Sequence, residues 1–437
     1  MKLLDFVTAH PETDLQDIFA HVYPNQTYDA RRIHSLLGAL YKQLLRFLAW
    51  QEMNESPEQE SIFALQALRK MNAESAFESE ARRLTKHLEK QTLKDPAFHF
   101  NAYQVAIEED TYLTQRQVRK PNQAFQKQMD ALDHFYFGAK FVLSAEALSR
   151  NAIIGGAYQT PFTETMCEWY DQAGDEHIKG PWVKIQRQLL RCLQEPDQAE
   201  HYESFIALLE VHKELLPLDS LRYLYKSAQN YCIRRINSGD ARFQKALFEL
   251  FQTMLDQDLL LNEQQQISHS DVKNIVTVAL RQKAFDWTDA FIKNYSQRVH
   301  TKHRENVTAY CQALYDANTG NNQQAIRRLR EVSFTDVLYD LSARRLLAQI
   351  YYEQEDWEAL NHHYNAFDLF LRRQKQLSTH NRKSHLNFVR ILKALAKWEE
   401  RRHFQNAEKN EKQKITIRDR IESTEPLAYR EWLRELV

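Results

Sequence analysis

Four carboxylates in the middle of the chain have the spacing of one helical face. Glu164, Glu168, Asp171 and Asp175 follow one another at intervals of four, three and four residues. On an α-helix, this spacing places all four side chains along one stripe. Converging carboxylates can bind a divalent cation, or keep a proton at neutral pH through mutual repulsion. A solvated helix face beside a loop has the same pattern, and we interpret the acidic stripe in this way.

A histidine motif, His300-x-x-His303-x-Glu305, has a spacing at which side chains of one helix can share a metal ion. Without further ligands, we interpret these residues as ordinary surface groups near a helix junction. The sequence contains no glycine-rich phosphate loop, no His-Glu-x-x-His and no Gly-x-Ser-x-Gly. It therefore predicts no catalytic residue, no cofactor and no metal ion.

The C-terminal region has the strongest charge asymmetry. Residues 370–420 contain fifteen Lys and Arg against five Asp and Glu, which gives about +10. Such a region can bind nucleic-acid phosphates or an acidic protein segment, although a solvated final helix is the simpler interpretation. The candidate basic patch consists of Arg372, Arg373, Arg382, Lys383, Arg390, Lys393, Lys397, Arg401 and Arg402.

The whole chain has a formal net charge of −1, so it has no global attraction to nucleic acid or to an anionic membrane. The four cysteines are widely spaced and contain no Cys-x-x-Cys, which predicts buried, unpaired thiols in a reducing compartment. No run of eighteen apolar residues occurs, and Asp5 interrupts the first apolar residues before a signal peptide can form. We therefore expect a cytoplasmic protein.

Eight glycines and ten prolines among 437 residues leave little material for β-hairpins and tight turns. Leu, Ala, Gln, Glu, Lys and Arg dominate, and all of them favour helices. The sequence therefore predicts an all-α fold.

The pattern of one helical hairpin occurs three times between residues 271 and 370, with a period of 35 residues. The turns read Ala-Phe-Asp-Trp, Thr-Gly-Asn-Asn and Gln-Glu-Asp-Trp. An Asp or Asn thus precedes each second helix, where it can accept free backbone N–H groups. The aligned columns are Val278, Ala313 and Ala348 in the first helices, and Trp287, Asn322 and Trp357 with Ala290, Ala325 and Leu360 in the second helices.

This region resembles the tetratricopeptide repeat, most closely in the segment from Leu347 to Trp357. The period of 35 residues is near the 34 of that family. Asn322 replaces an aromatic residue, Leu360 replaces a small one, and the terminal prolines of the family are missing. The resemblance covers about a hundred residues. It implies a right-handed superhelix of helical hairpins, an α-solenoid, with a groove that binds a protein segment.

Glycines, prolines and polar segments divide the rest of the chain. A long helix from about Asp29 has a broad apolar face, which we expect to pack against another element. Glu52–Glu60 is interpreted as a polar connector. The predicted divisions are an N-terminal helical head (1–51), degenerate helical pairs (61–154), a Gly- and Pro-containing loop or hinge (155–181), tetratricopeptide-like repeats (182–370), and basic C-terminal helices with a cap (371–437).

These observations favour a non-catalytic scaffold or adaptor that binds a protein segment or helix in its groove. A nucleic-acid-associated regulator that uses the basic C-terminal region is the first alternative. An enzyme built on the acidic stripe near residues 164–177 is the second. The sequence indicates no membrane partner.

Overall fold

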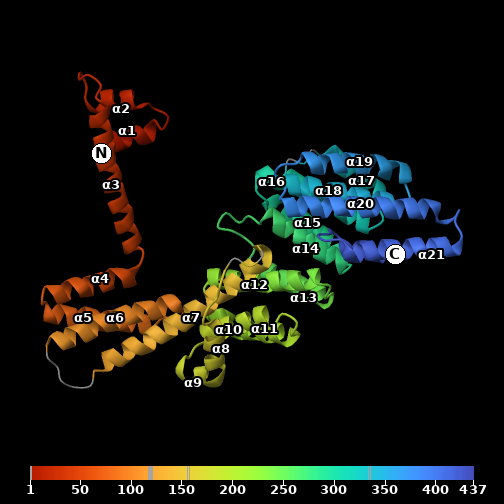
Figure 1. Cartoon of the computed structure of the whole chain (residues 1–437). Helices are drawn as coiled ribbons and strands as arrows, with labels where there is room; N and C mark the ends of the chain where they lie inside the picture. The colour runs from red at the N-terminus through yellow and green to blue at the C-terminus, as the bar shows by residue number, and fades with distance from the viewer. Residues whose placement is uncertain (1, 117–121, 155, 157, 333, 335) are drawn as a thin grey trace. The chain divides into compact units, whose positions relative to one another are not determined.

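The computed structural model describes residues 2–116, 122–154, 156, 158–332, 334 and 336–437 (Figure 1). Within these ranges the regular structure is helical, and the only β-type pairing consists of isolated bridges at Ile267. The all-α prediction is confirmed. None of the described helices has the combination of length and apolarity that crossing a lipid bilayer requires. The chain forms two compact units, unit 1 (1–194) and unit 2 (195–437).

Unit 1 begins with a small helical cluster that continues into helical pairs. Its helices are α1 (Lys2–Ala9), α2 (Leu15–Val22), α3 (Ala30–Asn54), α4 (Pro57–Lys70), α5 (Glu74–Glu89), α6 (Pro96–Gln115), α7 (Gln123–Ile154), α8 (Thr163–Trp169), α9 (Asp175–His177) and α10 (Pro181–Gln194). The helices α4 and α5 pack together, as do α6 and α7.

Helix α3 starts as the sequence predicts, because the Asp29 carboxylate accepts the backbone N–H groups of Arg31 and Arg32. Its apolar face is only partly covered. Ile33 at the start of this face is buried, but Phe47 is 54% exposed and Leu48 is 49% exposed. The expected packing is therefore found at the N-terminal end of the face and not at these C-terminal positions.

Two segments expected to be irregular are helical. The predicted connector 52–60 is interrupted only between Asn54 and Pro57, where α3 ends and α4 begins. Within the predicted loop or hinge 155–181, residues 163–177 form α8, a π-helical turn and α9. Met166, Cys167 and Tyr170 are buried there, so apolar side chains between the glycines hold the segment on the unit.

Unit 2 is a succession of helical hairpins followed by a C-terminal extension. Its helices are α11 (Ala199–His212), α12 (Leu218–Asn237), α13 (Arg242–Asp256), α14 (His269–Arg281), α15 (Phe285–Tyr295), α16 (Thr301–Asn318), α17 (Asn322–Glu331), α18 (Val337–Glu353), α19 (Trp357–Arg373), α20 (Thr379–Arg402), α21 (Ala407–Ser423) and α22 (Arg430–Glu435).

The three predicted hairpins are present as α14–α15, α16–α17 and α18–α19. Two residues after the end of each first helix, the backbone adopts a positive φ. These residues are Lys283, Gly320 and Glu355. The N–H of the next residue then donates to the carbonyl five residues earlier, at 2.8 to 3.0 Å. This is the hydrogen bond of a Schellman motif, and it fixes the same tight turn in all three hairpins.

The first hairpin is two residues out of the predicted register. The turn residues 283, 320 and 355 are 37 and 35 residues apart, rather than 35 twice. Counted from these turns, Val276 and Thr288 occupy the fully buried positions, and Ala290 is exposed. The columns therefore hold for Ala313, Ala325, Ala348 and Leu360, which are all buried. Val278 is also buried, but Val278, Trp287 and Ala290 lie two residues away from the equivalent positions.

The register shift also moves the predicted caps. Asp356 caps α19, since its carboxylate accepts the Ala359 N–H at 3.0 Å. Asn321 precedes α17 without a side-chain capping bond, and Asp286 lies inside α15. Trp357 packs edge-on against Tyr352 of its own hairpin, whereas Trp287 packs against Phe248 of the preceding one.

Consecutive hairpins pack through their first helices. Helix α14 contacts α16, and α16 contacts α18, in addition to each hairpin's own second helix. This packing brings the N-terminal ends of α14, α16 and α18 to one side of the stack (Figure 1).

The C-terminal segment folds back on the hairpins, as the sequence predicts. The ring of Trp432 meets those of Tyr352 and Phe388, and the Asn387 side chain donates to the Pro426 carbonyl at 2.8 Å. All four cysteines are buried and unpaired, as predicted.

Candidate functional site

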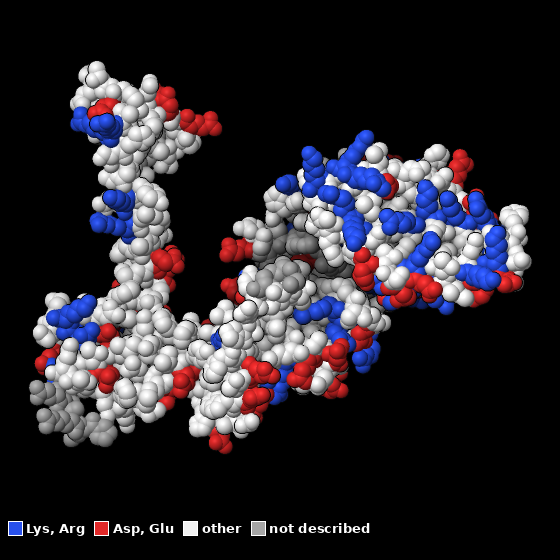
Figure 2. Space-filling view, viewed as in Figure 1, with Lys and Arg blue, Asp and Glu red and all other residues white. Residues whose placement is uncertain are grey.

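The predicted basic patch lies on α19 and α20. On α20, Lys383, Arg390, Lys397 and Arg401 are exposed and recur at helical spacing, so they share one face with the half-buried Lys393. We call these five residues the α20 basic stripe. None of them forms an ion pair with a described residue. Figure 2 shows Lys and Arg side chains over this part of unit 2.

The other members of the basic patch are engaged locally. Arg372 pairs with Asp368 and Arg402 pairs with Glu399, while Arg382 donates to the carbonyls of Gln374 and Leu377. Arg373 is exposed on α19. The patch therefore divides into the α20 basic stripe, which has no ion pair to a described residue, and arginines that bond within their own helix or, for Arg382, to the segment between α19 and α20.

The acidic stripe does not form on one continuous α-helix. Helix α8 ends at Trp169 and gives way to a π-helical turn, which breaks the spacing of three and four. Glu164 and Glu168 are exposed, and the side chain of Asp175 lies outside the described residues. Asp171 pairs with Arg187 at 2.6 Å and with Arg191 at 2.8 Å.

These arginines determine the protonation of Asp171. Burial by itself would raise the pKa of the carboxyl group, but hydrogen bonds from both guanidinium groups outweigh it and lower the pKa. Asp171 is therefore a carboxylate at neutral pH, so the proton-sharing acid considered for this stripe is not supported at this position.

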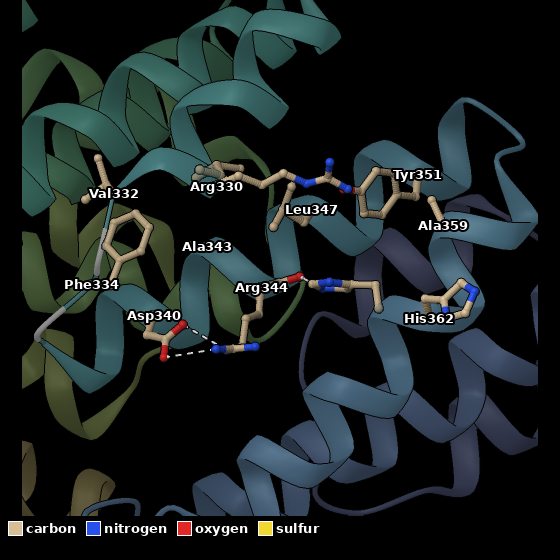
Figure 3. Close-up of a pocket in the computed structure, with 12 residues that line it drawn as sticks. Arg330, Val332, Phe334, Asp340, Ala343, Arg344, Leu347, Tyr351, Ala359 and His362 are labelled. Carbon is tan, nitrogen blue, oxygen red and sulfur yellow. Dashed lines mark hydrogen bonds and ion pairs between the residues drawn. The ribbon is translucent and has the colours of Figure 1, made fainter.

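A cavity with a volume of about 600 Å³ lies where α17, α18 and α19 meet. Figure 3 shows its lining. Arg330 reaches across to Tyr351, whose hydroxyl accepts a hydrogen bond from the guanidinium at 2.7 Å. Arg344 pairs with Asp340 at 2.8 Å. Leu347 and Ala343 supply apolar surface between these polar groups.

The charge of this cavity is unbalanced. Among the described residues that line it, Asp340 is the one carboxylate, and Arg344 already neutralises it. Arg330 has no carboxylate within ion-pair distance among the described residues, and its guanidinium lies near the Tyr351 ring, 5.8 Å from the ring centre. The side chain of His362 is exposed at the cavity rim. The cavity therefore favours an anionic group from outside the chain.

His363 has a structural part in the cavity wall. Its Nε2 lies 2.6 Å from the Arg344 carbonyl, to which it must donate because a carbonyl only accepts. Burial lowers the pKa of the His363 ring to about 4, so the ring is neutral at pH 7. This bond connects α19 to α18 and fixes the backbone beneath Arg344.

A second group of cations lies on another face of α14 and α18. Lys273 donates to the Ser342 hydroxyl at 3.1 Å, and its ammonium approaches the Tyr339 ring, 5.5 Å from the centre. The guanidinium of the buried Arg345 lies 3.7 Å from the centre of the Tyr429 ring and also donates to the Tyr310 hydroxyl. Tyrosine rings thus take the place of carboxylates around these cations.

No pattern in the sequence indicates the residues that line the cavity between α17, α18 and α19. Arg330 belongs to a basic run on α17, but such a run gives no sign of which side chain faces a cavity. The cavity arises from the packing of three helices, and Arg344 and Asp340 differ from other i, i+4 pairs only by that packing.

No protein-family model, no curated protein and no solved structure matches this chain. The likeness to tetratricopeptide repeats therefore rests on the residues and the hairpin geometry alone.

Proposed function

We propose that the protein is a non-catalytic helical scaffold that binds an acidic segment of a partner protein in the cavity between α17, α18 and α19. The proposal is carried by one observation: the cavity is lined by two arginines and one carboxylate, so Arg330 remains without a counter-ion among the described residues. A partner's carboxylate would supply one, with its apolar neighbours packed against Leu347 and Ala343.

The hairpins support a scaffold in a second way. First helices that stack on one another present successive, independently variable side chains to a ligand, as in a tetratricopeptide-like superhelix. We propose this superhelical arrangement for α14–α19. Four buried, unpaired cysteines fit a scaffold that works in the reducing cytoplasm.

The test compares charge reversals at two exposed arginines. Arg330→Glu changes the cavity, and Arg281→Glu makes the same change at the end of α14, where no partner for Arg281 is recorded. Each immobilised variant captures proteins from nuclease-treated native extract, and overlapping peptides from the captured proteins are then assayed for direct binding.

We expect acidic peptides that bind the wild-type chain and the Arg281 variant, with at least a tenfold loss for Arg330→Glu, because a charge-assisted contact becomes a repulsion. Capture and peptide binding that are equal for both variants would refute the cavity as the partner site.

The α20 basic stripe supports a second candidate function, binding to nucleic acid. Its five cations share one face without recorded carboxylate partners. If nucleic acid binds there, the slope of log affinity against log salt should fall by about 0.7 to 0.9 for each cation removed. A double variant, Arg390→Ala with Lys397→Ala, tests this slope. An unchanged slope argues against the candidate.

A further inference from the structure

Three side chains that are far apart in the sequence meet at one side of the hairpin stack. His269 is the first residue of α14, His303 lies in the first turn of α16, and Asp336 is the N-cap residue of α18. They are 34 and 33 residues apart, so each comes from the corresponding place in successive hairpins. The packing of α14 on α16 and of α16 on α18 brings these helix starts together.

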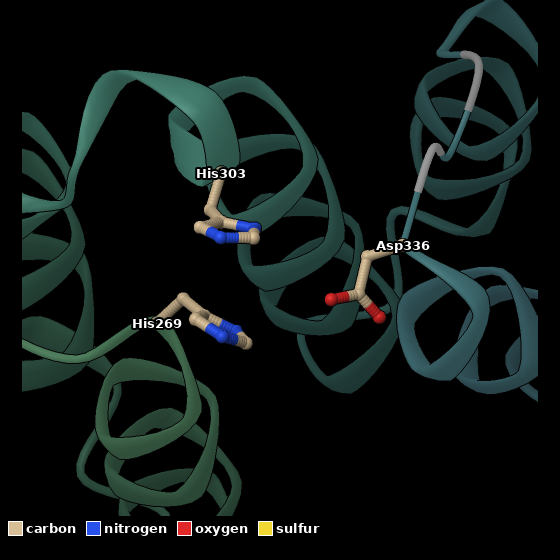
Figure 4. A group of neighbouring side chains, drawn as sticks. All are labelled: His269, His303 and Asp336. Carbon is tan, nitrogen blue, oxygen red and sulfur yellow. The ribbon is translucent and has the colours of Figure 1, made fainter. Parts of the chain in front are cut away.

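The geometry of this group suits a shared ion. One ligand atom from each residue lies within 4.8 Å of the others. The two imidazole rings are stacked, with centres 4.4 Å apart and planes 20° apart, and the Asp336 carboxylate points toward their edges (Figure 4). Ligands that share an ion at bonds of about 2.1 Å lie roughly 3.0 to 3.4 Å apart, so small side-chain rotations complete the site.

The ligand atoms also lack competing partners. No side-chain hydrogen bond of either histidine to a described residue is recorded, and Nδ1 of His269 is buried without a partner. One oxygen of Asp336 accepts the N–H groups of Leu338 and Tyr339, and the other is free of described partners. A bound cation would satisfy atoms that the protein leaves unpaired.

We propose that His269, His303 and Asp336 bind one divalent transition-metal ion, such as Zn²⁺ or Fe²⁺, that joins the starts of α14, α16 and α18. Two imidazoles and one carboxylate form a ligand set typical of these ions, and they leave coordination positions open.

The open positions face a cavity. His269 and His303 line a space of about 420 Å³ together with His300, Arg222 and apolar residues from the segment 259–261. The cavity admits water or a small anionic ligand as a further ligand of the ion. The positive ends of the helix dipoles of α14 and α16 oppose a cation here, and the Asp336 carboxylate offsets this effect. An anionic further ligand would also be favoured for this reason.

The experiment uses the full-length chain after removal of metals with a chelator. Zn²⁺ is titrated calorimetrically, and Co²⁺ binding is followed by its visible absorption, which reports the coordination geometry. The variants are His269→Ala, His303→Ala and Asp336→Asn. Asn caps a helix about as well as Asp, so Asp336→Asn removes the charge and keeps α18 capped. His134→Phe, in unit 1, is the matched control because His134 is also one of two stacked histidines.

We expect one Zn²⁺ per chain for the wild type and for His134→Phe, and affinity at least about 100-fold weaker in each ligand variant, with unchanged circular dichroism. The Co²⁺ spectrum should show nitrogen and oxygen ligation and should be lost in His303→Ala. Absence of stoichiometric binding, or three variants that bind like the wild type, would overturn the proposal.

Discussion

Two pairs of stacked histidines, one in each unit, look alike and differ in what surrounds them. In unit 1, His99 of α6 stacks on His134 of α7 with ring centres 4.6 Å apart and planes 25° apart. In unit 2, His269 stacks on His303 at 4.4 Å and 20°. The paired residues are 35 and 34 positions apart in the sequence. Ring geometry and spacing therefore do not distinguish the two pairs.

In the pair of unit 1, hydrogen bonds occupy the ring of His134, whereas Nε2 of His99 is buried without a partner. The backbone N–H of Lys179 can only donate, so Nε2 of His134 accepts it at 3.2 Å. The ring proton is then on Nδ1, which donates to the Asp130 carbonyl at 2.7 Å. Both nitrogens of His134 are occupied, and the described residues place no metal-ligating third group beside this pair. In unit 2, no hydrogen bond to a described residue occupies the ring nitrogens of His269 and His303, and the Asp336 carboxylate is the third possible ligand. Whether a histidine pair can bind a metal thus depends on its neighbours.

Among single residues, acid should act most strongly through His99 of the unit 1 pair, because its pKa lies further below the usual value than that of His363 in unit 2. Burial and the neighbouring His134 lower the pKa of His99 to about 3, below its usual value near 6.5. Between these values the unfolded chain binds a proton that the folded chain excludes. Stability is therefore complete above pH 6.5 and falls as the pH decreases, by about 1.4 kcal/mol per pH unit.

Hydrogen exchange of the α6 and α7 amides at pH 6 and pH 4 measures this effect. The opening free energy should fall by about 3 kcal/mol in the wild type, and by much less in His99→Gln, which does not titrate. The control is His34→Gln, because His34 is exposed on α3. The same acid dependence in His99→Gln and the wild type would show that His99 is not the responsible group.

Asp336 should have two separable roles, as a cap and as a metal ligand. In metal-free protein, Asp336→Ala should cost about 1 kcal/mol, because the N–H groups of Leu338 and Tyr339 lose their acceptor. Asp336→Asn should cost little. The measurement is hydrogen exchange at these two amides without and with Zn²⁺.

If Zn²⁺ protects the first turns of α14, α16 and α18 in the wild type, it should protect them in neither variant. If Zn²⁺ still protects these turns in Asp336→Asn, the carboxylate caps α18 but does not bind the ion. The two histidine pairs would then be more alike than we propose.

The sequence predicted the hairpins well because helix periodicity and turn residues are local properties. Gly320 and Asp356 indicate the turns in which they lie. Ala313 and Ala348 are buried, as the repeat pattern predicts. The register of the first hairpin was wrong because its Asp-Trp pair, Asp286 and Trp287, lies inside α15, whereas in the third hairpin Asp356 caps α19 and Trp357 begins it.

The sequence did not indicate the proposed metal ligands for a different reason. His303 was considered with His300 and Glu305, its neighbours on one helix, whereas its partners lie one hairpin before and one hairpin after it. The hairpin period was the available signal, since residues about 34 apart at the starts of stacked helices meet in space. The cavity beside Arg330 had no such signal, because it depends on how three helices pack.

The smallest expected effect concerns the bonds that close the unit 1 pair. His134→Phe keeps an aromatic ring on His99 but removes the acceptor for Lys179 N–H and the donor to the Asp130 carbonyl. These bonds are exposed to solvent, so their loss should cost only about 0.5 to 1 kcal/mol. The exchange of the Lys179 amide should become roughly two- to fivefold faster, while that of α6 changes less. If the Lys179 amide exchanges at the wild-type rate, the bond does not hold this segment. His134 then has a free nitrogen, and only the missing carboxylate distinguishes its pair from His269 and His303.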